Sequence, residues 1–104
     1  MAKEERVAAA GEVGDGVIKG IKVGGESLLL ANVAGKIYAV SDMCTHEECN
    51  LSDGGILEGV EIECSCHGAR FDVTSGEVTE EPAEEPLNTY GVTVRGDDVF
   101  VSLE

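Results

Sequence analysis

All cysteines and histidines of the chain lie in one stretch, CTHEECNLSDGGILEGVEIECSCH, which runs from Cys44 to His67. Thiolate and imidazole groups are the ligands that zinc and iron–sulfur sites use. The stretch contains two short loops, Cys44-Thr45-His46 and Cys64-Ser65-Cys66-His67, with 17 residues between His46 and Cys64. Each loop offers one thiolate and one imidazole at close spacing, which predicts metal or redox chemistry.

Two alternative metal sites use some of the same residue types. Structural zinc sites favour C-x2-4-C paired with H-x3-5-H, and that combination of spacings is absent. A plant-type four-cysteine cluster begins C-x4-C-x2-C. Cys44 and Cys49 match its first interval, but Ser52 stands where the next cysteine is required. Both alternatives stay open, and the spacing argues against each.

Short strands must position the two loops. Apolar, β-branched runs separated by glycine recur along the chain, at Val17–Val23, Ser27–Val33, Lys36–Val40, Val92–Val94 and Val99–Val101. Hairpin signals join several of them, at Gly24-Gly25, Ala34-Gly35 and Gly96-Asp97-Asp98. No segment has a convincing 3.6-residue period. The pattern therefore predicts an all-β sandwich or barrel.

The length of the chain predicts one domain over residues 1–104, with a small aliphatic core. One segment, from Glu77 to Glu85, is strongly acidic and contains Pro82. Because proline cannot donate to a sheet ladder and like charges repel, we expect this segment to be an exposed loop.

The chain is strongly acidic, with 21 Asp and Glu against 7 Lys and Arg and a net charge of −14 at pH 7. Nucleic acid and anionic membranes would repel such a protein. A solvated acidic coat and a docking surface for a basic partner both explain the charge. No apolar run approaches the length of a signal peptide or of a membrane helix. We therefore expect a cytoplasmic protein without a membrane anchor.

Beyond the ligand spacing, the chain resembles the soluble Rieske-type 2Fe-2S ferredoxins. The resemblance covers most of residues 40 to 103, including the run from Cys66 to Asp72 (CHGARFD) and the later Pro82 and Pro86-Leu87. It implies an antiparallel β-sandwich with two cluster-binding loops and one Rieske 2Fe-2S cluster. In that cluster two cysteines hold one iron and two histidines hold the other. The implied ligands are Cys44, His46, Cys64 and His67.

The resemblance also bears on the two surplus cysteines, Cys49 and Cys66. In the Rieske proteins of respiratory and photosynthetic complexes, cysteines at these places form a disulfide between the cluster loops, whereas many bacterial Rieske ferredoxins lack it. Two buried free thiols in a reducing compartment are the alternative. We expect the disulfide, because two cysteines in matching places of two touching loops are hard to explain separately.

Four further residues have roles implied by the resemblance. Gly68 lets the backbone approach the cluster, and Pro82 is the closest match to a proline loop that covers it. High-potential Rieske proteins carry Ser and Tyr where this chain has Ala69 and Phe71. Without those hydroxyl donors, negative charge on sulfur is less stabilised. The sequence therefore predicts a low potential for the Rieske class.

The implied function is that of a one-electron carrier and not of an enzyme, since all cysteines and histidines are already assigned. By analogy with the family, the chain is expected to pass electrons from a flavin-type reductase to an oxygenase or another terminal acceptor. It would act as a monomer and dock on basic partner surfaces. One alternative is a small Rieske subunit held in a reductase or respiratory complex, and a more distant one is a zinc-stabilised β module without redox function.

Overall fold

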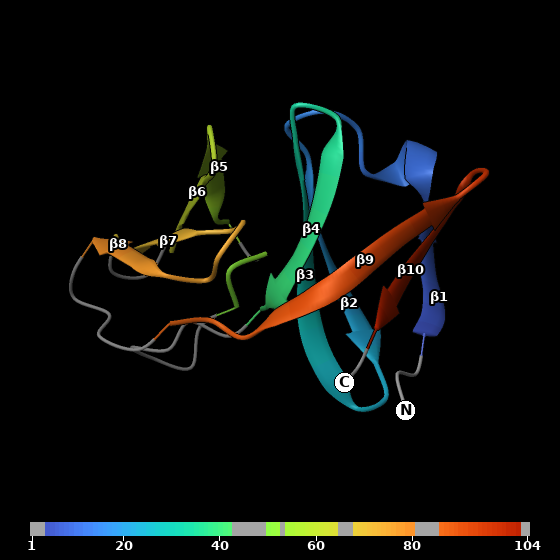
Figure 1. Cartoon of the computed structure of the whole chain (residues 1–104). Coiled ribbons are helices and arrows are strands. Elements are labelled where there is room, and N and C mark those ends of the chain that lie inside the picture. The colour runs from blue at the N-terminus through green and yellow to red at the C-terminus, as the bar shows by residue number, and fades with distance from the viewer. Residues whose placement is uncertain (1–3, 43–49, 53, 65–67, 81–85, 103–104) are drawn as a thin grey trace.

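The structure is a computed structural model that describes residues 4–42, 50–52, 54–64, 68–80 and 86–102. Short strands form most of these residues (Figure 1). Their bounds are β1 Glu4–Ala9, β2 Ile18–Val23, β3 Glu26–Val33, β4 Lys36–Ser41, β5 Ile56–Glu58, β6 Glu61–Glu63, β7 Arg70–Asp72, β8 Val78–Glu80, β9 Thr89–Arg95 and β10 Asp98–Ser102. A 3-10 turn, η1 Ala10–Glu12, follows β1.

The strands form two antiparallel sheets. A six-stranded sheet has the order β1-β10-β9-β4-β3-β2, and a four-stranded sheet has the order β5-β6-β7-β8. Figure 1 shows the six-stranded sheet curling on itself, with the smaller sheet at one side of it. The all-β prediction is confirmed. Within the described ranges, no helix is long and apolar enough to cross a membrane.

The predicted hairpins of the large sheet are also confirmed. Strands β2 and β3 are joined by Gly24-Gly25 with φ angles of 56° and 85°, and β3 and β4 by Ala34-Gly35 with φ angles of 53° and 92°. Two central residues with positive φ are the mark of the type I′ turn, whose twist matches that of paired strands. Gly96, with φ of 61°, begins the turn between β9 and β10.

Strand β3 contributes to two hydrophobic clusters because it is buried on both faces. Leu28 and Leu30 pack with Val99 and Val101 inside the curled six-stranded sheet. Leu29 and Ala31 point to the opposite face, since successive strand side chains alternate, and they join the cluster shared with the small sheet. That second cluster, called here the inter-sheet core, contains Leu29, Ala31, Val40, Leu51, Ile62, Cys64, Ala69, Phe71, Val73 and Leu87.

One sequence-based expectation is wrong in part. The segment Glu77–Glu85 was expected to be an exposed loop, but its residues Val78–Glu80 form β8, which pairs with β7 at the edge of the small sheet. An edge strand tolerates exposed acidic side chains, because one of its faces and one of its backbone edges remain in water. Residues 81–85 of the segment lie outside the described residues.

Gly76 lies between β7 and β8 and is hydrogen-bonded to the segment that leads into β9. Its N–H donates to the Asp72 carbonyl at 2.6 Å, and its carbonyl accepts from the Leu87 N–H at 2.7 Å. Its φ is +81°, and a Cβ at this position would overlap the Leu87 carbonyl oxygen. Gly59 has a similar φ of +61°, but a Cβ there would meet nothing within 4 Å.

We therefore predict that Gly76→Ala destabilises the protein more than Gly59→Ala does. Gly59→Ala should cost about 1–2 kcal/mol for a left-handed backbone alone, and Gly76→Ala should cost about 1–3 kcal/mol more for the overlap. Denaturant unfolding of both variants beside the parent measures the difference. Equal losses in the two variants would show that the Leu87 backbone moves aside at little cost.

Candidate metal centre

Cys64 lies at the base of the connection between β6 and β7. Its N–H donates to the Ala69 carbonyl at 2.8 Å, and its own carbonyl accepts from the Gly68 N–H at 2.9 Å. These two bonds join the two ends of the connection. Gly68 has a φ of +76°, which favours glycine, and a Cβ there would meet nothing within 4 Å. The backbone conformation, and not crowding, therefore accounts for glycine after His67 in this connection.

The first predicted ligand loop has its base in the same core. Cys44 and His46 lie outside the described residues, but the chain on either side of them is described. The Leu51 N–H donates to the Asp42 carbonyl at 2.6 Å, which joins the two ends of this loop. Leu51 is fully buried in the inter-sheet core beside Cys64. The bases of both predicted ligand loops thus meet in one cluster.

The third segment of interest, residues 81–85 with Pro82, lies outside the described residues. Its base has the same construction as the other two. The Leu87 N–H bonds to the Gly76 carbonyl at 2.7 Å, and the Leu87 side chain is 4% exposed and belongs to the inter-sheet core. Each of the three connections is therefore closed by a backbone hydrogen bond in which one partner belongs to the same apolar cluster: Cys64, Leu51 or Leu87.

Of the predicted site residues, Cys64, Ala69 and Phe71 are brought together in the inter-sheet core, and all three are fully buried. The other predicted ligands and the predicted disulfide pair lie outside the described residues, namely Cys44, His46, His67, Cys49 and Cys66. In the described part of the chain, no three His, Cys, Asp or Glu side chains converge as a metal site. Their predicted roles remain predictions.

The described residues fit a Rieske cluster. A fully buried thiolate is costly unless a metal or another charge neutralises it. The Cys64 side chain is fully buried, and its neighbours Ala69 and Phe71 are apolar and also fully buried, so a thiolate at this place would need the charge of a metal. An apolar shell that excludes water is one of the features that tune an iron–sulfur cluster. The donor set of the two loops, two thiolates and two imidazoles, is the one that a Rieske cluster requires.

Arg70, on β7, is the functional candidate that sequence reasoning missed. Its Nη2 lies 2.7 Å from Glu63 Oε1 and 3.0 Å from Glu58 Oε1, and its Nη1 lies 3.3 Å from Glu61 Oε1. The hydrogen bond to Glu61 is the main cause that raises the pKa of Arg70 above its ordinary value. One guanidinium thus joins three carboxylates of β5 and β6 at the base of the second ligand loop.

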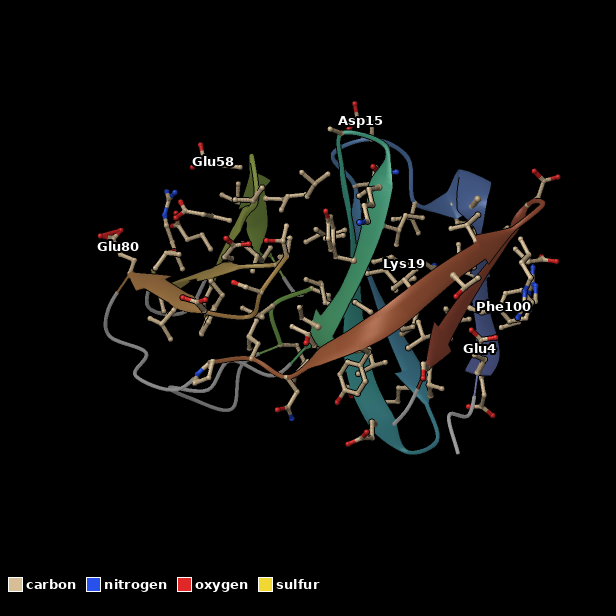
Figure 2. All side chains as sticks on the ribbon, viewed as in Figure 1. Glu4, Asp15, Lys19, Glu58, Glu80 and Phe100 are labelled. Atoms are coloured by element: carbon tan, nitrogen blue, oxygen red, sulfur yellow. The ribbon has the colours of Figure 1, made fainter. Side chains whose placement is uncertain are left out.

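The outer face of the small sheet carries several carboxylates close to this arginine. Glu61 stands directly opposite Glu58 on one side and Asp72 on the other, while Arg70 stands opposite Glu63 and Glu80. Figure 2 shows Glu58 and Glu80 on the two edge strands of this sheet, β5 and β8, with their side chains pointing away from the six-stranded sheet. The available signal was the close spacing of Glu58, Glu61 and Glu63 in the sequence, but strand pairing is needed to interpret it.

With this geometry established, comparisons identify the class of protein. A family model, the Rieske [2Fe-2S] domain, matches residues 3–91. The chain is 39% identical over 98 residues to the ferredoxin component of the p-cumate 2,3-dioxygenase system of Pseudomonas putida, covering 93% of this chain and 83% of that one. It is 41% identical over 92 residues to the ferredoxin component of the naphthalene 1,2-dioxygenase system of Pseudomonas aeruginosa, covering 88% of each chain.

A solved structure gives the same result in three dimensions. A chain in the complex of reduced oxygenase and oxidized ferredoxin in carbazole 1,9a-dioxygenase superimposes with a TM-score of 0.89 at 35% identity, covering 95% of this chain and 92% of that chain. The protein belongs to the Rieske [2Fe-2S] domain family. It is a Rieske-type ferredoxin with one 2Fe-2S cluster, and it is an electron carrier and not itself an enzyme.

The Arg70 cluster generates a prediction about stability. Arg70→Gln removes the cation that holds three carboxylates together, so these carboxylates should repel one another and lower the melting temperature. Arg6→Gln is the matched control, because Arg6 pairs with a single carboxylate, Asp98, at 2.7 Å on the other sheet. Thermal unfolding should show a larger loss for Arg70→Gln, and the difference should shrink at about 1 M NaCl, where the screening length is about 3 Å. A salt-independent difference would assign the loss to packing of the Arg70 stem.

Proposed function

We propose that this protein carries single electrons from a flavin-type reductase to the terminal oxygenase of a dioxygenase system. The observation that carries the proposal is the near full-length match to ferredoxin components of two such systems, with 88–93% of this chain covered. The likeness to a chain from an oxygenase–ferredoxin complex supports the oxygenase as acceptor. These relatives favour the carrier over a Rieske subunit held in a reductase or respiratory complex.

In this proposal Cys44 and Cys64 hold one iron of the cluster, and His46 and His67 hold the other. The cluster supplies reversible uptake of one electron when it is bound. Cys64 follows β6 directly and is fully buried, and its surroundings keep water away from the sulfur. The imidazoles each have a second nitrogen that can hydrogen-bond a partner or lose a proton. Pro82 covers the site from the third segment, and the unit spans residues 1–104 as one domain.

The proposed potential is low for a Rieske protein. Ala69 and Phe71 are both fully buried in the inter-sheet core with Cys64, and neither carries a hydroxyl that could donate to sulfur. The carboxylates of the small sheet act in the same direction, because negative charge disfavours the addition of an electron. We also propose that Cys49 and Cys66 form a disulfide between the two ligand loops.

The acidity of the chain supports docking on basic partner surfaces. The net charge is −14, and the outer face of the small sheet carries Glu58, Glu61, Glu63, Asp72 and Glu80 around a single arginine. Complementary charge speeds the encounter of two proteins and sets their orientation more than it adds affinity. A monomeric, cytoplasmic carrier that must meet two partners in turn would benefit from such steering.

The function is tested by EPR of the reduced protein together with a pH titration of its potential. We expect a rhombic spectrum with a low average g value, and a potential that falls at alkaline pH as the ligand imidazoles lose protons. A potential independent of pH would indicate four thiolate ligands instead. A colourless protein that contains zinc would overturn the redox assignment altogether.

The proposed low potential is tested by restoring the missing hydroxyls. Ala69→Ser and Phe71→Tyr should each raise the potential, because a hydroxyl donor near sulfur stabilises the reduced, more negative cluster. Phe100→Tyr is the matched control, since Phe100 lies on β10 and packs against Arg95, with the guanidinium carbon 4.3 Å from the ring centroid. Protein-film voltammetry measures all three. No rise in either test variant would show that these two positions do not face the cluster sulfur.

A further inference from the structure

Asp42 is a buried carboxylate with every polar group of its side chain and backbone engaged. It follows β4 directly and is 3% exposed. Its Oδ1 accepts from the Ser52 N–H at 2.7 Å, and its Oδ2 accepts from the Ser52 hydroxyl at 2.7 Å. Its carbonyl accepts from the Leu51 N–H at 2.6 Å, and its N–H donates to the Ser27 carbonyl of β3 at 3.1 Å.

Three of these four bonds join the two ends of one segment. Asp42 precedes residues 43–49, and Leu51 and Ser52 follow them. The fourth bond, to Ser27, ties the arrangement to the six-stranded sheet. Leu51, which bonds to Asp42 through its backbone, has its side chain in the inter-sheet core with Cys64. The Asp42–Ser52 pair thus connects the base of the first ligand loop to the cluster that holds the second.

Strand β2 is fitted closely against this pair. Gly20 lies opposite Leu29 in the β2–β3 ladder. A Cβ on Gly20 would overlap the Ser52 hydroxyl oxygen and lie 3.3 Å from Asp42 Oδ2. Only glycine lets the strand backbone approach so closely. The pair is therefore held from both sides, by its own hydrogen bonds and by the strand that covers it.

We propose that Asp42 is a positioning residue for the 2Fe-2S cluster. By bonding Ser52 with both carboxylate oxygens, it fixes the two ends of the segment that carries the predicted ligands Cys44 and His46. The proposal rests on the ligand set given under the proposed function. A residue that orients metal ligands without touching the metal typically changes metal retention by 10–100-fold when it is replaced.

Asp42→Ala removes both side-chain hydrogen bonds to Ser52. Asp42→Asn keeps two hydrogen bonds to Ser52, because the amide oxygen accepts from the Ser52 N–H and the amide nitrogen can donate to the Ser52 hydroxyl. The matched control is Asn32→Ala. Asn32 is also buried, at 7% exposed, and also closes a loop base, with its Nδ2 2.8 Å from the Val13 carbonyl and its Oδ1 2.8 Å from the Gly35 N–H. Neither partner belongs to a ligand loop.

The readouts are the rate at which an iron chelator bleaches the visible absorbance of the cluster, the EPR linewidth of the reduced protein, and the melting temperature. Asp42→Ala should lose its cluster at least about tenfold faster than the parent and give broader EPR lines. Asp42→Asn should restore both toward the parent. Asn32→Ala should lower the melting temperature but release its cluster at the parental rate.

Two outcomes would overturn the proposal. One is a parental release rate in Asp42→Ala, and the other is equal acceleration in Asp42→Ala and Asn32→Ala, which would make Asp42 an ordinary stabilising residue. If Asp42→Ala does not fold, Ser52→Ala takes its place. This variant removes the bond from the Ser52 hydroxyl to Asp42 Oδ2 and keeps the bond from the Ser52 N–H to Asp42 Oδ1. Faster release in Ser52→Ala supports the proposal, and parental release contradicts it. Failure of the proposed function is distinguishable, because the parent protein would then lack a Rieske EPR signal.

Discussion

The burial of β3 on both faces is the constraint on which the rest of the structure depends. Leu28 and Leu30 fill the interior of the curled six-stranded sheet, while Leu29 and Ala31 form one wall of the inter-sheet core. Full burial of each leucine stabilises the fold by about 1.5–3 kcal/mol. Both clusters share this strand, and among the described residues the small sheet has no core separate from them. Its four strands rely on the large sheet for apolar surface that they cannot bury against one another.

This dependence explains why the three connections near the candidate metal centre are built alike. Three-residue strands are too short to be stable alone, so each connection is anchored where it begins and ends. Backbone bonds join Cys64 to Gly68, Asp42 to Leu51 and Gly76 to Leu87. In each pair one member is buried in the inter-sheet core. Rigid bases on a shared core are what a cluster needs when its ligands come from two separate loops.

Sequence reasoning succeeded where the signal is local and failed where it depends on pairing. Strands β2, β3 and β4 could be predicted because apolar, β-branched runs flank two-residue turns with positive φ, such as Ala34-Gly35. The type of cluster could be predicted because the ligand spacing is specific to one type, whereas the assignment of the four ligands stays a prediction. Strands β5 to β8 have three residues each, which is too short to show a strand period in the sequence. Strand β8 also lies in an acidic stretch that resembles a loop. The contacts of Arg70 with glutamates on two other strands exist only once the sheet is assembled.

The small sheet carries a charge arrangement that opposes its own stability. Like charges placed directly opposite in neighbouring strands are destabilising, yet Glu61 faces Glu58 and Asp72 at once. Arg70 offsets part of this repulsion, and burial of Ile62 and Phe71 on the inner face offsets more. Metal binding adds folding free energy in small metal domains, so the cluster itself would stabilise the sheet that bears these carboxylates. The fold is held from within in this way, and it therefore tolerates the acidic outer face on which the proposed docking to a basic partner depends.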